Sequence, residues 1–486
     1  MRPPNCLPRP RTLLYAVLAF ASAQGSLWGA EELVAAAKAQ MAKYAGQMED
    51  LAKWCDQQGL SEQAQKTRAW LAPRDPSKLY VVILPETIGR PKLPLDAPKD
   101  VAQWDARFAQ LQRDQAAALF GLAQRAMRAG RSSLAFDLLM AAVRENPDHE
   151  VIRQKLGYQK FRGSWRTQFE VANLRADRVW HDQFGWLPKS FVRRYEQGQR
   201  FLNGRWVSAA EEARQRREID SGWEVETEHY VIRTNHSLEA GVALGRNLEK
   251  LYRVWKQLFF RYYTPDDQAG ALFEGGGRLA RHHVVYFRDK DDYVRALRSG
   301  FPNIEMSIGI YADGLRRACF FAGDEYSDRT LFHEATHQLF HESRPVAADV
   351  AHRANAWVVE GIAMYMETLR DEDGFHVLGG FDDVRMRGAQ YRLLKEDFYV
   401  PLADLVAYGF PKLQGDKRIV ALYGQAAGLT SFLIHYDGGR YRDALVAYLK
   451  AVYSGRDDLG TLSRLAGTGY AELDRQYRKF MESGGR

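Results

Sequence analysis

The chain has 486 residues, of which 46% are hydrophobic and 12% aromatic, so it can bury at least one large core and should fold as two or more domains. Its formal charge is +7, and the acidic and basic residues are interspersed along the chain instead of forming blocks. These features argue against a disordered chain and against a polyanion-binding protein, so we expect no nucleic-acid partner.

The first 23 residues are typical of a secretory signal peptide. Arg2, Arg9 and Arg11 precede an apolar run from Leu13 to Ala23, which ends in three small residues. The run has about half the roughly 20 residues that a membrane-spanning helix needs, and no later run approaches that length. We therefore expect cleavage of residues 1–23, export to the periplasm or the extracellular space, and no membrane span in the mature chain.

Residues 24–158 are predicted to form a helical N-terminal region. Apolar residues recur at steps of three and four from Glu31 to Gln57, and helices are expected at 101–129, 132–145 and from 150 onwards, with an isolated strand at 79–85. Small residues at the helix contacts and the turn "NPDH" resemble tetratricopeptide-type hairpins. Only one or two such units are visible, so a plain helical domain is an equal alternative. Either kind of region can bind a protein partner.

Residues 159–222 are predicted to be a connector with two small hairpins. The segments "FRGSWRT" (161–167) and "LNGRWVS" (202–208) each place a glycine and then a tryptophan after an apolar residue. Asn203-Gly204 is a strong signal for a two-residue hairpin turn. We expect Trp165 and Trp206 to cover an interface, since buried aromatic residues more often serve packing than ligand binding.

Two cysteines, Cys55 and Cys319, remain once the signal peptide and its Cys6 have been removed. In an oxidising compartment they could form a disulfide, and two buried thiols are the alternative that the sequence leaves open. Neither cysteine belongs to a Cys-x-x-Cys pair, so a zinc site with thiolate ligands is not predicted.

Residues 223–486 are predicted to form an α+β domain. Strands are expected at 229–234 and 282–287, separated by a helix that starts after Ser237. The segment 307–321 is predicted to be a hairpin that turns at Asp313-Gly314. A helix follows directly. This order indicates a mixed sheet with helices on one side.

That helix, "LFHEATHQLFHES" (331–343), contains the pattern HExxH. Residues four apart lie on one face of a helix, so His333 and His337 can bind the same ion. Glu334 lies about 100° further round the helix, where it can reach a metal-activated water without becoming a ligand. A charged glutamate among apolar neighbours needs a cation or several donors, which favours a zinc site over a structural pair.

The third ligand should come from a second helix. His341 lies one turn beyond His337 on the same helix, and three ligands in a row on one straight helix cannot approach a tetrahedral ion together. Glu360, in "NAWVVEGIAMYMETL" (355–369), is the remaining candidate. Glu367 follows it by two turns on the same face. It either accepts the ring N–H of a ligand histidine or lies at a solvated helix end.

The stretches "HEATH" and "WVVEGIAMYME" together resemble the gluzincin metallopeptidases, distantly the aminopeptidase N-like branch. The resemblance implies that His333, His337 and Glu360 bind Zn²⁺ and that Glu334 is the general base. In this group a tyrosine on a later helix stabilises the oxyanion, and "ALYGQAAGLTSFLIHY" (421–436) is similar to that segment. By this resemblance Tyr423 is expected to be a catalytic residue, and a tyrosine that serves core packing is the alternative.

One element of that branch is missing. The strand before the zinc helix, "GLRRACFF", has no residues that would hold the free α-amine of a substrate, although its edge could pair with an extended peptide. The whole chain is similar to exported bacterial gluzincin-like proteins with helical repeats ahead of the peptidase domain. We expect an exported zinc peptidase acting on peptides or proteins, with endo- or exo-cleavage left open. The alternative is a non-catalytic, zinc-containing envelope protein that recruits partners through its helical region.

Overall fold

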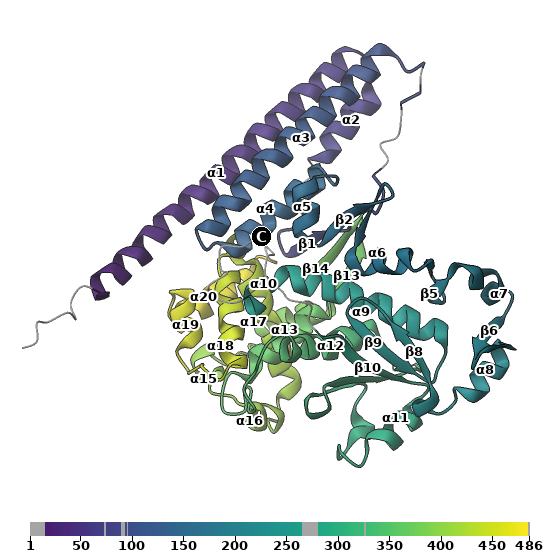
Figure 1. The fold of residues 1–486 in the computed structure, drawn as a ribbon. Helices are drawn as coiled ribbons and strands as arrows, with labels where there is room; N and C mark the ends of the chain where they lie inside the picture. Colours follow the sequence, from purple (N-terminus) through teal and green to yellow (C-terminus); the bar gives the residue numbers. More distant parts are fainter. Residues whose placement is uncertain are drawn as a thin grey trace, which may run out of the picture. The chain divides into compact units, whose positions relative to one another are not determined.

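The computed structural model describes residues 15–71, 74–88, 93–94, 96–264, 280–324 and 327–484. The chain divides into two units (Figure 1). One comprises Met1–Ala72 with Pro91–Asn146, and the other comprises Pro73–Arg90 with Pro147–Arg486. Of the expected signal peptide, residues 1–14 lie outside the described residues, and helix α1 begins at Tyr15. Among the described helices, none combines the length and apolar character needed to cross a membrane.

The first unit is helical, as predicted. Its described helices are α1 (Tyr15–Gln57), α2 (Ser61–Trp70), α3 (Lys99–Arg128) and α4 (Ser132–Glu145). The buried carboxylate of Glu145 joins three of them, because it accepts hydrogen bonds from the Tyr44 hydroxyl (2.7 Å) and from the Trp70 indole N–H (2.9 Å). Cys55 packs in the core of this unit, whereas Cys319 is buried in the other, and both are free thiols.

The expectation of an isolated strand at 79–85 is wrong. Strand β1 (Lys78–Val82) pairs antiparallel with β14 (Phe375–Gly379), whose other neighbour is β13 (Arg370–Glu372). The predicted helical region at 24–158 is therefore interrupted by a segment of the second unit, to which α5 (Glu150–Lys155) also belongs. Nothing local in the sequence of β1 identifies a partner almost 300 residues away.

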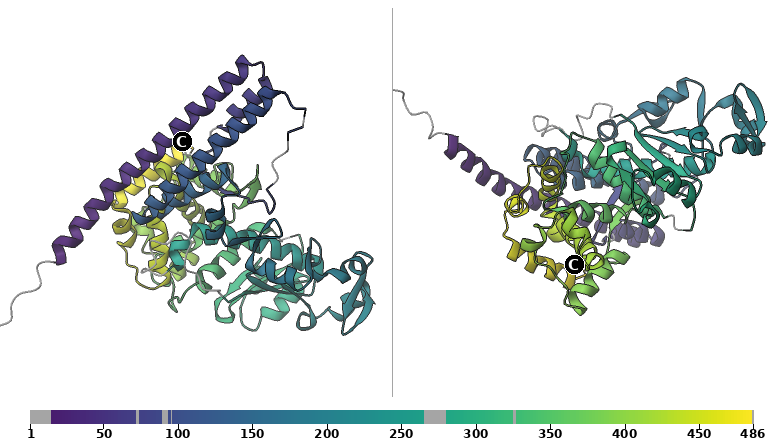
Figure 2. Two further views of the ribbon diagram at one scale, coloured as in Figure 1. Left: turned by 45° about the horizontal axis from the view of Figure 1, so that its top comes forward. Right: turned by 90° about the horizontal axis from the view of Figure 1, so that it is seen from below.

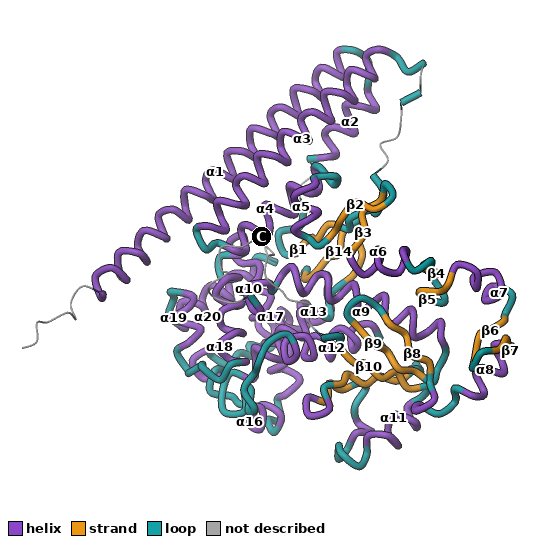
Figure 3. Tube along the Cα trace, in the orientation of Figure 1, coloured by secondary structure: helices purple, strands orange, loops and turns teal. Residues whose placement is uncertain are grey.

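Three hairpins follow α5, one more than expected (Figure 3). The predicted pairs are β2 (Tyr158–Phe161) with β3 (Ser164–Thr167), and β6 (Gln199–Leu202) with β7 (Arg205–Ser208). Between them β4 (Arg178–His181) pairs with β5 (Gly185–Pro188). Short helices follow the hairpins: α6 (Gln168–Arg175), α7 (Val192–Glu196) and α8 (Ala209–Gln215). Trp186 lies in the extra hairpin, and its Gly-Trp pair lacks the intervening residue present in the other two.

A five-stranded mixed sheet forms the centre of the second unit, as predicted. Its strands are β8 (Trp223–Glu226), β9 (Tyr230–Thr234), β10 (His282–Phe287), β11 (Ile310–Ala312) and β12 (Arg317–Phe321), in the order β11-β12-β10-β9-β8. Strand β10 runs parallel to both β9 and β12, whereas the edge strands β8 and β11 are antiparallel to their neighbours. Strands β11 and β12 form the hairpin expected at 307–321.

Helices cover both faces of this sheet, which corrects the expectation of one-sided packing. Helix α9 (Leu238–Leu258) begins at Ser237, whose hydroxyl accepts the Ala240 N–H, and packs against Val225 and Ile232. On the opposite face α11 (Lys290–Leu297) packs against Cys319 and Phe321. Side chains alternate between the faces along each strand, so the two sets of contacts require helices on both sides. The predicted α+β class is confirmed.

The helices after the sheet position the candidate site. Helix α12 (Asp328–Glu342) packs on α13 (Ala356–Met366), and every residue of α13 is buried. Gly361 allows α13 to approach α17 (Ile419–Gly439) closely, since a Cβ there would lie 2.8 Å from the Ala426 carbonyl oxygen. The remaining helices are α10 (Phe260–Tyr263), α14 (Val384–Lys395), α15 (Leu402–Leu405), α16 (Phe410–Gln414), α18 (Arg442–Tyr453), α19 (Thr461–Ala466) and α20 (Tyr470–Glu482).

His435 on α17 gives the second unit a pH-dependent stability. Its Nε2 lies 2.9 Å from the Tyr365 hydroxyl of α13. Burial, with a smaller contribution from the charge of Arg442, lowers the pKa of His435 to about 3. Between about pH 6.5 and 3 the unfolded chain binds a proton at this residue that the folded chain does not, so stability is lost as the pH falls.

We expect the free energy of unfolding to fall more steeply below pH 6.5 for the wild type than for His435→Gln. The difference between the two slopes should approach about 1.4 kcal/mol per pH unit, because one proton is linked to unfolding. Urea unfolding at pH 7, 6 and 5 measures both slopes. The contributions of titrating groups that the two proteins share cancel when one slope is subtracted from the other. Parallel slopes would show that His435 is not the group responsible.

Candidate metal centre

Helix α12 places two imidazole rings side by side. The helix starts at Ser327, whose hydroxyl accepts the Thr330 N–H, and its regular turns put His333 and His337 on one face. Their Nε2 atoms are 3.2 Å apart. The two side chains are 16% and 14% exposed.

Helix α13 brings a carboxylate to these rings. Glu360 Oε2 lies 3.5 Å from the Nε2 of His333, and Oε1 lies 3.9 Å from that of His337. One ligand atom from each of the three residues falls within 4.8 Å of the others. Bonds of about 2.0–2.1 Å to a tetrahedral ion place its donor atoms roughly 3.3 Å apart. The three groups therefore fit around one cation with a position left open, and this is the set that the sequence predicted.

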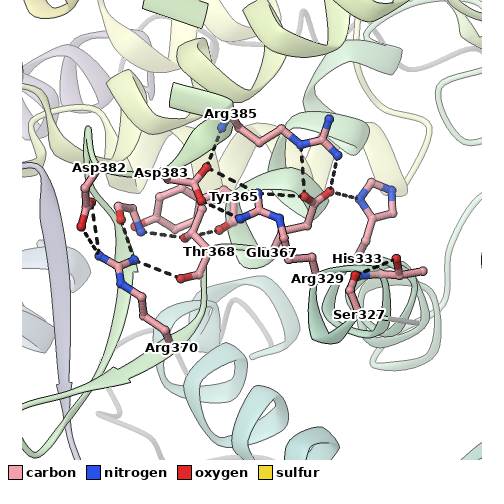
Figure 4. A network of polar contacts seen from close by, with 12 residues as sticks. Ser327, Arg329, His333, Tyr365, Glu367, Thr368, Arg370, Asp382, Asp383 and Arg385 are labelled. Carbon is pink, nitrogen blue, oxygen red and sulfur yellow. Dashed lines mark hydrogen bonds and ion pairs between the residues drawn. The ribbon is translucent and has the colours of Figure 1, made fainter. Parts of the chain in front are cut away.

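Glu367 lies against His333 and not at a solvated helix end. Its side chain is 4% exposed, and Oε1 is 2.9 Å from the Nδ1 of His333. Two arginines hold the carboxylate from the other side: Arg385 at 3.1 Å to each oxygen and Arg329 at 3.2 Å. Asp383 pairs with Arg329 at 2.7 Å, as Figure 4 shows. The ring of His333 is thereby fixed, with its Nε2 directed to Glu360.

Burial and the neighbouring carboxylates give the two histidines different proton affinities. Burial opposes charge on His333, but the hydrogen bonds to Glu360 and Glu367 outweigh it and raise its pKa to about 10. Burial lowers the pKa of His337 to about 4. Glu360 itself is buried, yet the interactions with both rings lower the pKa of its carboxyl group. Binding of a cation requires both rings neutral and Glu360 ionised, so it would displace the proton that Glu360 and Glu367 hold on His333.

Glu334 lies beside the cluster without joining it. Its Oε2 accepts the backbone N–H of Tyr311, in the edge strand β11, at 2.9 Å. Burial raises the pKa of Glu334 to about 7, against the opposing effects of His333 and of this N–H. A carboxylate with a pKa near neutrality can take up and release a proton at physiological pH, which suits a general base.

Tyr423, the expected catalytic tyrosine, is half-buried and lies near Glu360 and Glu334. The hydroxyl of Tyr423, on α17, forms no hydrogen bond with a described residue. Burial and then the charges of Glu360 and Glu334 raise the pKa of Tyr423, so its hydroxyl stays protonated near these carboxylates.

His341 stands apart from the three ligand residues. Its ring packs between those of Tyr311 and Tyr453, at centroid distances of 5.4 and 5.2 Å.

Sequence reasoning missed the groups that support the site. Arg329, Asp383 and Arg385 come from helix ends and meet only around Glu367. Asp383 has a local signal, because it precedes an amphipathic helix as a cap residue and accepts the Arg385 backbone N–H. The sequence carries no corresponding signal that the two arginines converge on one carboxylate.

No protein-family model matches the chain, and no curated protein matches it.

Proposed function

We propose that the chain is an exported zinc-dependent peptidase with a gluzincin-like fold in its second unit. The observation that carries the proposal is the convergence of His333, His337 and Glu360 beside Glu334. Two imidazole nitrogens and one carboxylate form a donor set used by catalytic zinc, which keeps a fourth position open. The mixed sheet, the HExxH helix and the helices that follow it are consistent with the gluzincin arrangement.

Each residue of the site then has a distinct role. A bound Zn²⁺ would polarise the substrate carbonyl and lower the pKa of a coordinated water towards about 7. Glu334 takes the proton from the attacking water and returns it to the leaving amine. The protonated hydroxyl of Tyr423 donates to the carbonyl oxygen as negative charge develops on it. Glu367 holds the ring of His333 in its binding orientation.

Strand β11 supports an extended peptide as the substrate. It is one edge of the five-stranded sheet, and its Tyr311 N–H reaches Glu334. Glu334 already accepts the Tyr311 N–H, so an extended chain at this edge would pair through the other outward backbone groups and would pass beside the general base. The position of Glu334 beside the ligand cluster favours catalysis over the alternative of a purely structural zinc site, which has no use for such a base.

Digestion of unfolded casein by the purified chain without residues 1–23 tests this proposal. We expect cleavage that stops when a chelator removes the metal and returns when one equivalent of Zn²⁺ is added. Metal analysis of the same sample establishes whether zinc is present. One zinc per chain with no cleavage of casein or of a peptide library would instead support the non-catalytic alternative.

Glu367 should strengthen zinc binding without being a ligand. Replacing it with glutamine removes the charge beside His333 and leaves Arg329 and Arg385 without their shared partner, so we expect zinc affinity to fall by about 10- to 100-fold. Competition with a chromophoric chelator measures this. Asp382→Asn is the matched control, because Asp382 pairs with Lys78 and Arg370 away from the cluster. Equal affinity in all three proteins would contradict this role.

A further inference from the structure

A cleft lies beside β8, at the edge of the five-stranded sheet opposite to β11. All four residues of edge strand β8 line it, together with residues of the second and third hairpin regions, and its volume is about 360 Å³. Its aromatic wall includes Phe184 and Trp186 of the second hairpin and Tyr195 of α7. Figures 1 and 2 show these hairpins at the end of the second unit remote from α18–α20. None of the residues that line the cleft belongs to α12 or α13, so the cleft is separate from the candidate metal centre.

The outer edge of β8 offers backbone groups for pairing. The Thr227 N–H donates to the Tyr230 carbonyl at 2.9 Å. Counting back from this bond in steps of two along the register, Val225 and Trp223 are the residues of β8 whose backbone groups face β9. In an antiparallel pair every second residue directs its N–H and C=O away from the partner strand. Here those residues are Glu224 and Glu226. Within the described part of the chain, no hydrogen bond uses their backbone groups.

Neighbouring carbonyls at this edge are already capped. Arg216 donates to the outward-facing carbonyl of Gly222 at 3.1 Å, just before β8 begins. Across the cleft, Arg178 donates to the Trp186 carbonyl at 2.7 Å, and Pro188 has no N–H to offer. Strand β5 therefore lacks these groups for pairing with an added strand, whereas the backbone groups in the central part of β8 are available.

The two faces of β8 differ in character. Trp223 and Val225 are buried and apolar, whereas the side chains of Glu224 and Glu226 are 48% and 54% exposed. Each glutamate has one arginine on the inner side of the sheet, Arg233 at 3.1 Å and Arg281 at 2.7 Å. A strand added on the outer side would place its own side chains opposite these carboxylates. Basic residues are favoured there, and apolar residues are favoured at the alternating positions that face the aromatic wall.

This charge pattern also argues against a second copy of the chain as the occupant. Pairing of β8 with the same strand of another molecule would bring its glutamates opposite identical carboxylates, and like charges opposite each other destabilise a strand pair.

We propose that the cleft beside β8 binds an extended peptide segment in which basic and apolar residues alternate. The segment pairs with the backbone of Glu224 and Glu226, directs its basic side chains to their carboxylates and buries its apolar side chains against the wall formed by the second hairpin. This site does not depend on the peptidase proposal, since it lies at the opposite edge of the sheet.

A fluorescein-labelled octapeptide of alternating lysine and valine is the probe. Binding is followed by fluorescence anisotropy with the full mature chain carrying Glu334→Gln, so that no cleavage interferes. The double substitution Glu224→Lys with Glu226→Lys should weaken binding at least tenfold and should create binding of the corresponding glutamate–valine octapeptide. Glu218→Lys, at an exposed position that does not line the cleft, should leave binding unchanged. Equal binding by the double variant overturns the proposal.

Backbone pairing has its own test. Only alternate residues of an added strand can donate to β8, so N-methylation of one alternate set of probe residues should abolish binding while methylation of the other set preserves it. Equal effects of both sets would overturn the strand pairing. Circular dichroism and thermal melting establish that each variant is folded. If the double variant does not fold, the two methylated probes with the parent protein decide the question.

Discussion

Replacing Glu334 with glutamine should lower kcat/KM for peptide hydrolysis by roughly two to four orders of magnitude while zinc content stays at the parent level. Glutamine has nearly the same shape and can still accept the Tyr311 N–H, so the geometry of the helix and strand is kept. What is lost is a group that can take a proton from water. Initial rates on a fluorogenic peptide, together with metal analysis, measure both quantities.

His341→Gln is the control for this substitution. It changes the third histidine of the same helix, which packs between Tyr311 and Tyr453 outside the metal cluster, so both activity and zinc content should change little. Loss of zinc from Glu334→Gln would mean that this residue contributes to metal binding. Undiminished activity with zinc retained would remove Glu334 as the base.

The part of the site that could be predicted depends on helical periodicity. His333 and His337 share a face because they are four residues apart, and Glu367 follows Glu360 on one face because two helical turns separate them. Such relations are local and survive any arrangement of the rest of the chain. The meeting of the three expected ligand atoms within 4.8 Å, and of Glu367 with His333, depends in addition on the packing of α13 against α12.

Relations between distant segments could not be predicted in this way. The local sequence cannot pair strand β1 with β14, because β14 lies almost 300 residues later in the chain. Arg329 and Arg385 meet at Glu367 only because the ends of α12, α13 and α14 converge, and no periodicity encodes that meeting. The second hairpin was missed for a different reason: its Gly185-Trp186 pair does not repeat the Gly-x-Trp spacing of the other two.

The position of Glu360 also depends on contacts made far from the cluster. Helix α13 starts at Asn355, a fully buried residue whose backbone lies in the left-handed region (φ 61°). Its side chain donates to Asp457 at 2.6 Å and accepts the Tyr448 hydroxyl at 2.6 Å. Because these contacts fix where α13 begins, they also set how far along it Glu360 lies from the rings on α12.

Replacing Glu360 with alanine should abolish stoichiometric zinc binding, with a larger loss of affinity than the roughly 10- to 100-fold expected for Glu367. The substitution removes the ligand from the second helix and leaves two histidines on one helix, which cannot complete a three-ligand site. The parent protein should melt at a lower temperature after chelation, since a ligand that binds only the folded state stabilises it. The melting temperature of Glu360→Ala should not respond to chelation.

Glu372→Ala provides the matched comparison, because Glu372 is a carboxylate in strand β13 that contacts Lys78 and Arg370 and not the histidines. It should keep one zinc per chain and the response to chelation. If Glu360→Ala also binds zinc with parental affinity, the metal is held by another set of groups. The 3.5 and 3.9 Å approaches of Glu360 to the two rings would then reflect only a buried ion pair. Glu334 would then have no metal-activated water from which to take a proton, and the proposed mechanism would fail with the metal site.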